Sequence, residues 1–130
     1  MSKLADLEAR YNGAEEGYTY LMEFKFKTKN GFKTLYKVGV TQNKPVDRML
    51  EIVRSFWTQR QYVPECRLVR YRKSASFREK EKSIHEELAE YRYKFNIKFS
   101  GYTEFFDADL EAMIFVYENF CPKIDKDLRI

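Results

Sequence analysis

Two segments of alternating polar and apolar residues, joined by an Asn-Gly turn, constrain this chain more than any other feature. In residues 18–27, aromatic and other apolar side chains recur at every second position, which is typical of a β-strand. Lys29-Asn30-Gly31 follows, and Asn-Gly tolerates the backbone angles that a tight hairpin demands. Residues 33–40 supply the partner strand. The chain is therefore expected to contain an antiparallel β-hairpin.

The remaining residues alternate between helical and extended patterns. Apolar side chains at helical spacing predict helices over residues 2–12, 45–61, 77–95 and 110–120, and Asp107 or Asp109 is placed to cap the last. Residues 66–72 alternate again and predict a third strand, and residues 102–106 predict a short extended piece. With no internal repeat or linker, residues 1–130 are expected to form a single α+β domain. Its small three-stranded, mainly antiparallel sheet is flanked by helices.

Composition indicates a globular protein, because 44% of the residues are hydrophobic and 34% are charged. No apolar run approaches the ~20 residues of a membrane helix, and residues 1–10 lack the order of a secretory signal. An intracellular protein without membrane contact is expected. Cys66 and Cys121 are expected to be free thiols, although the sequence alone leaves a disulfide between them open. With one histidine, a zinc site of cysteine and histidine has too few ligands.

Charge is unevenly distributed along the chain, whose net charge is +4. Residues 54–98 contain twelve Lys/Arg against six Asp/Glu, whereas residues 105–130 contain three against six. A basic middle suits a polyanion such as nucleic acid, because Lys and Arg neutralise phosphates. Arg70 and Arg72 on the third expected strand, and Arg78 on the following helix, are candidates for such contacts. An ordinary charged surface explains the same residues equally well.

Short motifs follow one another in a characteristic order. Gly17-Tyr18-Thr19-Tyr20-Leu21 lies in the first strand and Tyr36-Lys37-Val38-Gly39-Val40-Thr41 in the second, and Pro45-Val46-Asp47-Arg48 begins a helix. Glu81-x-x-x-His85 and Gly101-Tyr102-Thr103-Glu104-Phe105-Phe106 come later. In this order the chain resembles the GIY-YIG nuclease superfamily, in particular the phage and bacterial branch whose second motif reads Tyr-Lys-Ile-Gly-x-Thr. The likeness spans residues 17–106 and leaves both terminal helices outside it.

The resemblance implies a metal-dependent endonuclease that hydrolyses phosphodiester bonds, with DNA as the expected nucleic acid. Tyr20 would activate the attacking water, and Arg48 would brace the scissile phosphate with its planar guanidinium. His85 would assist proton transfer. Glu104 would hold one divalent ion, Mg²⁺ or Mn²⁺, which acts as a Lewis acid. These four residues form the core of the expected site.

The second motif carries further candidates and one departure from the family pattern. Gly39 would let backbone and substrate approach closely because it has no side chain. Lys37 occupies the place of the motif's tyrosine, with Tyr36 just before it, so which of the two orients the nucleophile stays open. Lys37 and Arg48 are also candidates for contacts with nucleic acid.

Each candidate has a plainer interpretation as well. Tyr20 lies on the aromatic face of its strand and could simply belong to the core. His85 could be bonded to Glu81, because residues i and i+4 meet on one helix face. Glu104 is flanked by aromatic residues, where an isolated charge would be costly, so a metal or a basic partner is expected beside it.

A second function remains open from the sequence. The chain could keep the nuclease fold without useful catalysis and act as a binding or interference protein, for example a viral factor in the host cytoplasm that engages nucleic acid or a host enzyme. Its short length favours this alternative, since no separate DNA-recognition domain is present to target the activity. A nuclease of this size is expected to need a protein partner for targeting. A domain that binds only protein is a weaker third possibility.

Overall fold

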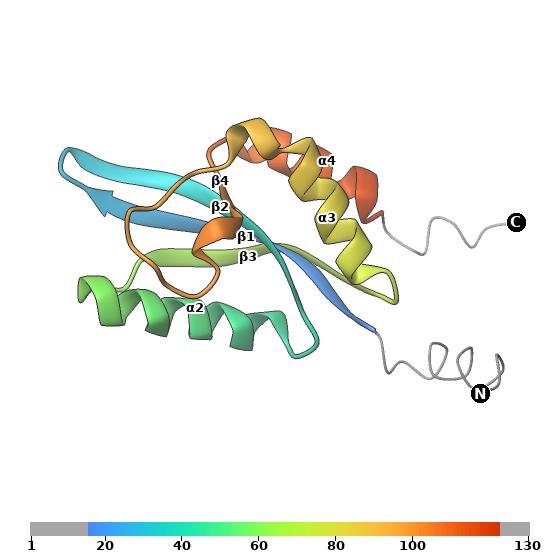
Figure 1. Cartoon of the computed structure of the whole chain (residues 1–130), viewed down its shortest axis with the longest axis horizontal. Helices are drawn as coiled ribbons and strands as arrows, with labels where there is room; N and C mark the ends of the chain where they lie inside the picture. Colours follow the sequence, from blue (N-terminus) through green and yellow to red (C-terminus); the bar gives the residue numbers. More distant parts are fainter. Residues whose placement is uncertain (1–15, 123–130) are drawn as a thin grey trace, which may run out of the picture.

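The computed structural model of the chain describes residues 16–122. The helix expected over residues 2–12 lies outside the described residues. The order of elements is β1 (Gly17–Thr28), β2 (Gly31–Thr41), α2 (Pro45–Arg60), β3 (Glu65–Ser74), α3 (Phe77–Glu87), two 3-10 turns (Ala89–Tyr91 and Tyr102–Glu104) with β4 (Phe105–Phe106) after the second, and α4 (Leu110–Phe120). Figure 1 shows α2 along one side of the sheet and α3 and α4 on the other.

The sheet confirms the hairpin and corrects the number of strands. β1 and β2 pair in antiparallel register from Tyr18 opposite Thr41 to Thr28 opposite Gly31, so Lys29 and Asn30 form the turn. The strand order is β3-β1-β2-β4, which makes four strands, not the expected three. β4 coincides with the last two residues of the extended piece expected over residues 102–106, which was not counted as a strand of the sheet because two residues show no alternation.

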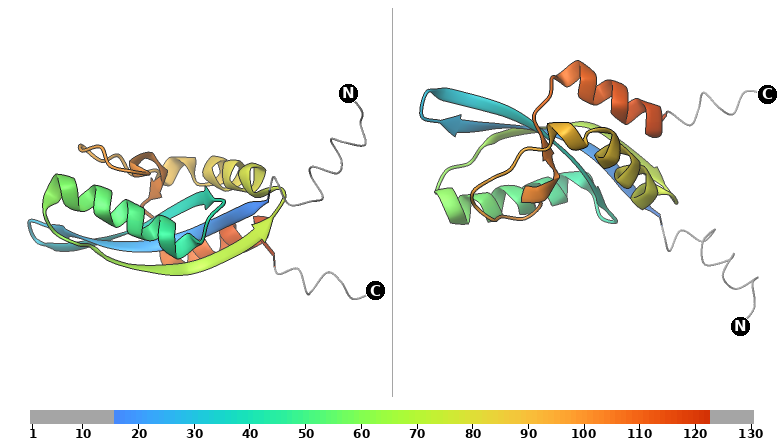
Figure 2. Two further views of the ribbon diagram at one scale, coloured as in Figure 1. Left: turned by 90° about the horizontal axis from the view of Figure 1, so that it is seen from below. Right: turned by 45° about the horizontal axis from the view of Figure 1, so that its top comes forward.

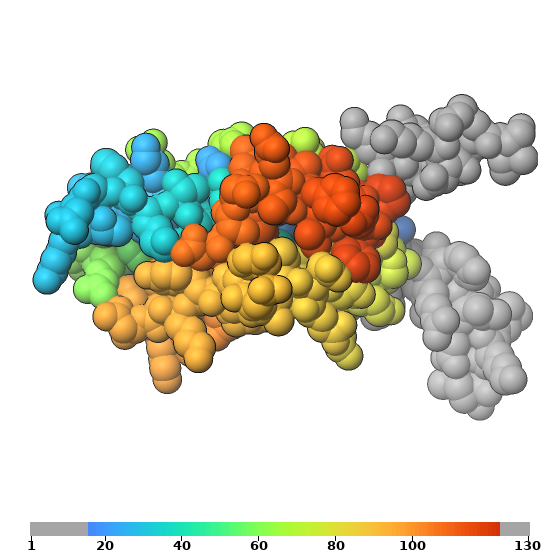
Figure 3. Space-filling model, turned by 90° about the horizontal axis from the view of Figure 1, so that it is seen from above, coloured from blue at the N-terminus to red at the C-terminus, as the bar shows by residue number. Residues whose placement is uncertain are grey.

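Both faces of the sheet are covered, which explains why β1 is buried almost throughout. On one face, Tyr20, Met22 and Phe24 pack with residues of α2 and of the segment 93–102. On the other face, Leu21 and Val38 pack with residues of α3 and α4. The two views of Figure 2 show these helices on opposite sides of the hairpin, and in the space-filling view α3 and α4 lie next to each other (Figure 3).

The expected helix over residues 77–95 ends earlier than predicted. α3 stops at Glu87, a 3-10 turn follows, and Tyr93 donates its backbone N–H to the Phe105 carbonyl at 2.9 Å. Pairing with the sheet edge therefore replaces the last helical turns. Phe95, which had been placed on the helical stripe, packs instead against the rings of Phe99 and Phe105.

The structure also tests the expected last helix, the cysteines and the short extended piece. The helix over residues 110–120 is confirmed, and the Asp109 carboxylate accepts a hydrogen bond from the Ala112 N–H at 2.8 Å, as a cap should. Cys66 and Cys121 are free thiols. The extended piece predicted over 102–106 is a 3-10 turn for its first three residues. Within residues 16–122, no helix combines the length and apolar character needed to cross a membrane.

Gln61, at the C-terminal end of α2, has a left-handed backbone conformation with φ of 63°. This conformation costs a residue with a Cβ about 1–2 kcal/mol, and glycine avoids that cost. We expect Gln61→Gly to raise the free energy of unfolding by about 0.5–1 kcal/mol in urea titrations, the gain being reduced by the greater freedom of glycine in the unfolded chain. Gln59→Gly, inside the same helix, should instead lower it by about 1 kcal/mol. Equal losses in both variants would contradict the expectation.

Candidate active site

Several of the residues singled out in the sequence converge at the edge of the sheet formed by β2. β4 pairs with Tyr36 and Lys37, so β2 continues past the end of its short neighbour. There the Val38 carbonyl accepts a hydrogen bond from His85 of α3. The edge of β2 beyond β4 thus faces α3 rather than another described strand. Short pairing at this edge leaves room for side chains from several elements.

The buried ammonium of Lys37 joins β1 and β2 to the 3-10 turn that precedes β4. Lys37 donates from Nζ to the Tyr20 hydroxyl at 2.9 Å and to Glu104 Oε1 at 2.5 Å. Tyr20 and Lys37 are 0% exposed, whereas the Glu104 side chain is 31% exposed. A charge this deep in a protein requires a partner, and Glu104 supplies it. The basic partner expected beside Glu104 is therefore Lys37.

Two glycines permit this contact. Gly39 lies opposite Tyr20 in the β1–β2 register, and a Cβ at Gly39 would overlap the Tyr20 hydroxyl and lie 2.7 Å from Lys37 Nζ. A Cβ at Gly101 would overlap the end of the Lys37 side chain, and the φ of 79° there also favours glycine. The close approach expected at Gly39 is thus an approach of protein groups to one another in this structure.

Arg48 reaches the same place from the first turns of α2. Its Nη1 donates to the Ser100 hydroxyl at 2.8 Å and pairs with Glu51 at 3.2 Å. The guanidinium also interacts with the Tyr20 phenol. Its side chain is 23% exposed, so it lies between the buried phenol and the surface. A partly exposed guanidinium with donors to spare can bind a phosphate.

His85 contributes an imidazole from α3. Because a carbonyl oxygen can only accept, the bond of 2.7 Å between Nε2 and the Val38 carbonyl requires a proton on Nε2. Burial lowers the pKa of His85 below its ordinary value, although the Val38 carbonyl opposes this change. The imidazole is therefore neutral at pH 7, and its Nδ1 is able to take up a proton.

Glu81 stands one turn before His85 and next to Glu104. Burial, and then repulsion from the Glu104 charge, raise the pKa of Glu81 to about 7. Its Oε2 atom is buried and has no hydrogen-bond partner among the described residues. It lies 3.9 Å from His85 Nε2, too far for the direct bond that the helical spacing allowed. Two neighbouring carboxyl groups, one of them readily protonated, complete the cluster.

We expect Glu81 to make stability depend on pH. Its folded pKa of about 7 lies above the ordinary 4.5, so the folded state keeps a proton that the unfolded chain releases. The resulting stabilisation is complete below pH 4.5 and is lost as pH rises through 7. In EDTA, the wild-type protein should lose on the order of 2 kcal/mol more than Glu81→Gln between pH 5 and 8, because the titration of His85 is common to both proteins. Urea titrations across this range measure it. Glu86→Gln, at an exposed position of α3, is the control, and its stability should depend on pH as that of the wild type does. If Glu81→Gln shows the same dependence as the wild type, the expectation is wrong.

Glu104 and Glu81 are the candidates for holding a hydrated divalent ion. Mg²⁺ and Mn²⁺ prefer carboxylate oxygens, and Mg²⁺ is usually held by one or two carboxylates together with water and substrate phosphates. Glu104 and Glu81 supply two neighbouring carboxylates, and the buried Glu81 Oε2 has no hydrogen-bond partner within residues 16–122. No group of three or more His, Cys, Asp or Glu in that range could hold a metal ion. An ion held by these two carboxylates would need water and substrate to complete its shell.

Some sequence candidates lie elsewhere. The Tyr36 hydroxyl donates to Glu23 at 3.0 Å, and its ring packs in the cluster under α3 and α4, away from Tyr20. Burial, followed by the bond to Glu23, raises the pKa of Tyr36 to about 12. Arg70 pairs with Glu118 of α4 at 2.9 Å, and Arg72 lies 3.9 Å from the same carboxylate. These three residues are not brought together with the cluster.

Arg78 does lie beside the cluster, because it precedes Glu81 by one turn of α3. Its positive charge opposes the rise that burial and Glu104 cause in the pKa of Glu81. Two contributors were not foreseen. Ser100, which accepts from Arg48, gave no sequence signal, since a serine before a glycine is common in turns. Gly101 belongs to the motif Gly101–Phe106, but neither its positive φ nor its contact with Lys37 could be foreseen from the sequence.

One comparison with known proteins gives a match. The family model of the T5orf172 domain, a domain associated with phage nucleases, matches residues 17–121. The match begins at β1 and extends through α4, a helix that the sequence motifs alone had left outside. No curated protein and no solved structure matches the chain. Such a domain indicates a nuclease-like or DNA-binding function. The chain belongs to the T5orf172 domain family.

Proposed function

We propose that this protein is a GIY-YIG-type endonuclease that uses one Mg²⁺ or Mn²⁺ ion to hydrolyse phosphodiester bonds in DNA. The observation that best supports the proposal is the contact chain from Tyr20 through Lys37 to Glu104, with Arg48 beside it. A phenol, an ammonium, a carboxylate and a guanidinium come together from four separate segments of the sequence. Apolar packing alone gives no reason for such a combination.

In this proposal Arg48 and Glu104 receive the substrate, because both are partly exposed and cover the buried phenol. A phosphate oxygen replaces Ser100 as the acceptor of the Arg48 guanidinium, while the Ser100 N–H keeps its hydrogen bond to Ser55 of α2. The binding of substrate thereby completes the site.

Tyr20 acts as the base in its deprotonated form and takes one proton from the attacking water, which leaves a neutral phenol and hydroxide for the attack. Lys37, which donates to the Tyr20 oxygen, is the positive charge nearest to that phenolate. Glu104 and Glu81 would hold the divalent ion, which when bound would supply a Lewis acid for the phosphate and the leaving oxygen. His85, which can take up a proton at Nδ1, is the proton carrier beside these two carboxylates. It would then deliver that proton to the departing alkoxide.

Nicking of supercoiled plasmid and of single-stranded DNA with Mg²⁺ or Mn²⁺ tests the proposal. We compare Arg48→Ala with Arg54→Ala, which removes an exposed arginine from the same helix. Glu104→Gln is compared in the same way with Glu86→Gln on the surface of α3. Nicking should be lost in the first member of each pair and kept in the second. Equal nicking by all proteins, or none by the wild type, would remove the proposal.

A binding protein without catalysis is the second candidate, and one observation favours it. Lys37 occupies Glu104, and Tyr20 is fully buried, so the site is closed as it stands. DNA binding that weakens with salt, survives Glu104→Gln and is never accompanied by cleavage would support this candidate. In either case DNA is the expected partner, inside a cell, and a second protein would direct the domain to its target.

A further inference from the structure

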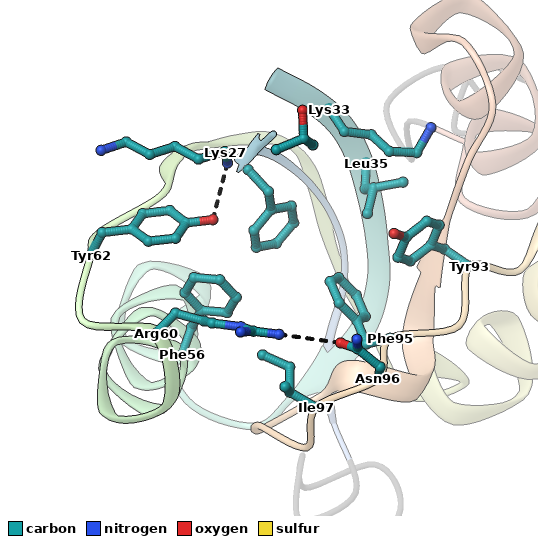
Figure 4. A pocket seen from close by; sticks show the side chains of 12 residues that line it. Lys27, Lys33, Leu35, Phe56, Arg60, Tyr62, Tyr93, Phe95, Asn96 and Ile97 are labelled. Atoms are coloured by element: carbon teal, nitrogen blue, oxygen red, sulfur yellow. Dashed lines mark hydrogen bonds between the residues drawn. The ribbon is translucent and has the colours of Figure 1, made fainter. Parts of the chain in front are cut away.

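A separate pocket of about 300 Å³ lies at the far end of the hairpin from the candidate active site. It is formed by the tip of β1 and β2, the last turns of α2, and the segment 93–97 (Figure 4). Its volume is at the lower end of the ~300–1,000 Å³ typical of small-molecule sites. The space therefore suits one planar ring system better than an extended chain.

The lining combines aromatic surface with positive charge. Tyr62 and Tyr93 stand on opposite sides, with Phe56 and Phe95 between them (Figure 4). Three cationic residues border the opening: Lys27, Lys33 and Arg60. Among residues 16–122, no acidic residue lines the pocket, although Lys33 is paired with Asp107 nearby. An aromatic interior with a cationic rim complements a base carried on a phosphate backbone.

Two elements connect this pocket with the candidate active site. α2 carries Arg48 at one end and Arg60 at the other, twelve residues apart, which is roughly 18 Å at the α-helical rise. The segment from Tyr93 to Gly101 runs beside it. Hydrogen bonds tie the two together at both ends, from Arg60 to Asn96 at 3.2 Å and from Arg48 to Ser100 at 2.8 Å. The Ser100 N–H also donates to Ser55 Oγ at 2.8 Å. These bonds hold the pocket and the candidate active site at a constant distance from each other along α2.

We propose that this pocket holds one unpaired base of a nucleic acid strand whose cleaved phosphate lies at Arg48. The preferred substrate is then single-stranded DNA, or DNA with an unpaired segment about 18 Å from the scissile bond. A base stacked and paired within a duplex cannot enter such a pocket, whereas an unpaired base enters without the cost of extrusion. Its ring would stack on Tyr93 or Tyr62, and the rim cations would bind the flanking phosphates. The substrate class rests on the proposed nuclease function, but base binding does not.

Binding is measured with the full chain in EDTA, which separates it from cleavage. The probes are a short fluorescein-labelled oligothymidylate and a duplex of the same length, followed by fluorescence anisotropy. We expect the single strand to bind more tightly, and Tyr93→Ala to weaken its binding by roughly 5- to 150-fold. Tyr91→Ala removes an exposed tyrosine two residues away, outside the pocket, and should bind as the wild type does.

A second variant guards against misfolding of the first, because Tyr93 packs against the core. Arg60 is exposed, so Arg60→Ala should fold normally and should reduce the slope of log affinity against log salt concentration by roughly 0.7. Equal affinity for single strand and duplex, together with equal binding by Tyr93→Ala and Tyr91→Ala, would overturn the proposal. So would a wild-type protein that binds neither probe.

Cleavage distinguishes this inference from the proposed function. Single-strand binding through Tyr93 without any nicking would leave the base pocket standing and remove the nuclease. Nicking of fully paired DNA that is unaffected by Tyr93→Ala would leave the nuclease standing and remove the substrate class.

Discussion

Tyr20→Phe is expected to lower the rate of DNA cleavage roughly 10²–10⁴-fold, the usual contribution of a general base, while Tyr36→Phe leaves the rate unchanged. Both substitutions remove one hydroxyl from a buried tyrosine of the central hairpin. They differ in what the hydroxyl contacts: that of Tyr20 accepts from Lys37, and that of Tyr36 donates to Glu23 on the other face. Single-turnover cleavage of a labelled oligonucleotide measures the rate.

This pair separates chemistry from folding, since each variant loses one hydrogen bond of similar length. The free energy of unfolding is measured alongside and should fall by a similar amount in both. If Tyr36→Phe were the inactive variant, the nucleophile would have to be oriented from the opposite face of the sheet, and the cluster around Lys37 would not be the active site.

Glu104→Ala is expected to destabilise the protein by about 3 kcal/mol, because it leaves the fully buried Lys37 ammonium without its carboxylate. The lower end of the usual range applies, since Glu104 is partly exposed and water already screens the pair. Lys37→Met removes the buried charge and fills the space with an apolar chain of similar length. We expect it to cost about 1 kcal/mol, because the remaining carboxylate can reach water. Urea titrations measure the free energy of unfolding of the wild type, Glu104→Ala and Lys37→Met.

The double variant decides the origin of the loss. Lys37→Met combined with Glu104→Ala should be more stable than Glu104→Ala alone, since no buried charge remains to be compensated. Additive losses would mean that the two side chains act separately. They would also mean that the short contact between them contributes little to the fold.

Much of the architecture follows from residue periodicity. The aromatic alternation of β1 and the Asn-Gly turn predict the hairpin, because a strand with one regular face leaves little freedom of register. α3 was predicted too long, because Tyr91 and Phe95 continue the helical spacing by chance. Their backbone is drawn instead to the sheet edge, where Tyr93 bonds to Phe105. A local pattern cannot reveal a competition with a partner distant in sequence.

The same limit applies to the site. Motif order brought Tyr20, Arg48 and Glu104 into one hypothesis, and the structure places their side chains together. What the sequence could not give is the burial of Lys37, whose charge would ordinarily be expected at the surface. That burial depends on Gly39 and Gly101 leaving space at once, one on each side of the ammonium. Such a coincidence is a property of packing.

The Lys37 ammonium draws its two partners from opposite ends of the folded segment, one near the start of β1 and one just before β4. A ribosome making this protein releases Tyr20 and Lys37 well before Glu104 emerges from the exit tunnel. Until then the Lys37 ammonium lacks its carboxylate, so a product truncated before Glu104 would have no partner for a charge that the fold removes from water. Stable folding around Lys37 during synthesis therefore has to wait for Glu104.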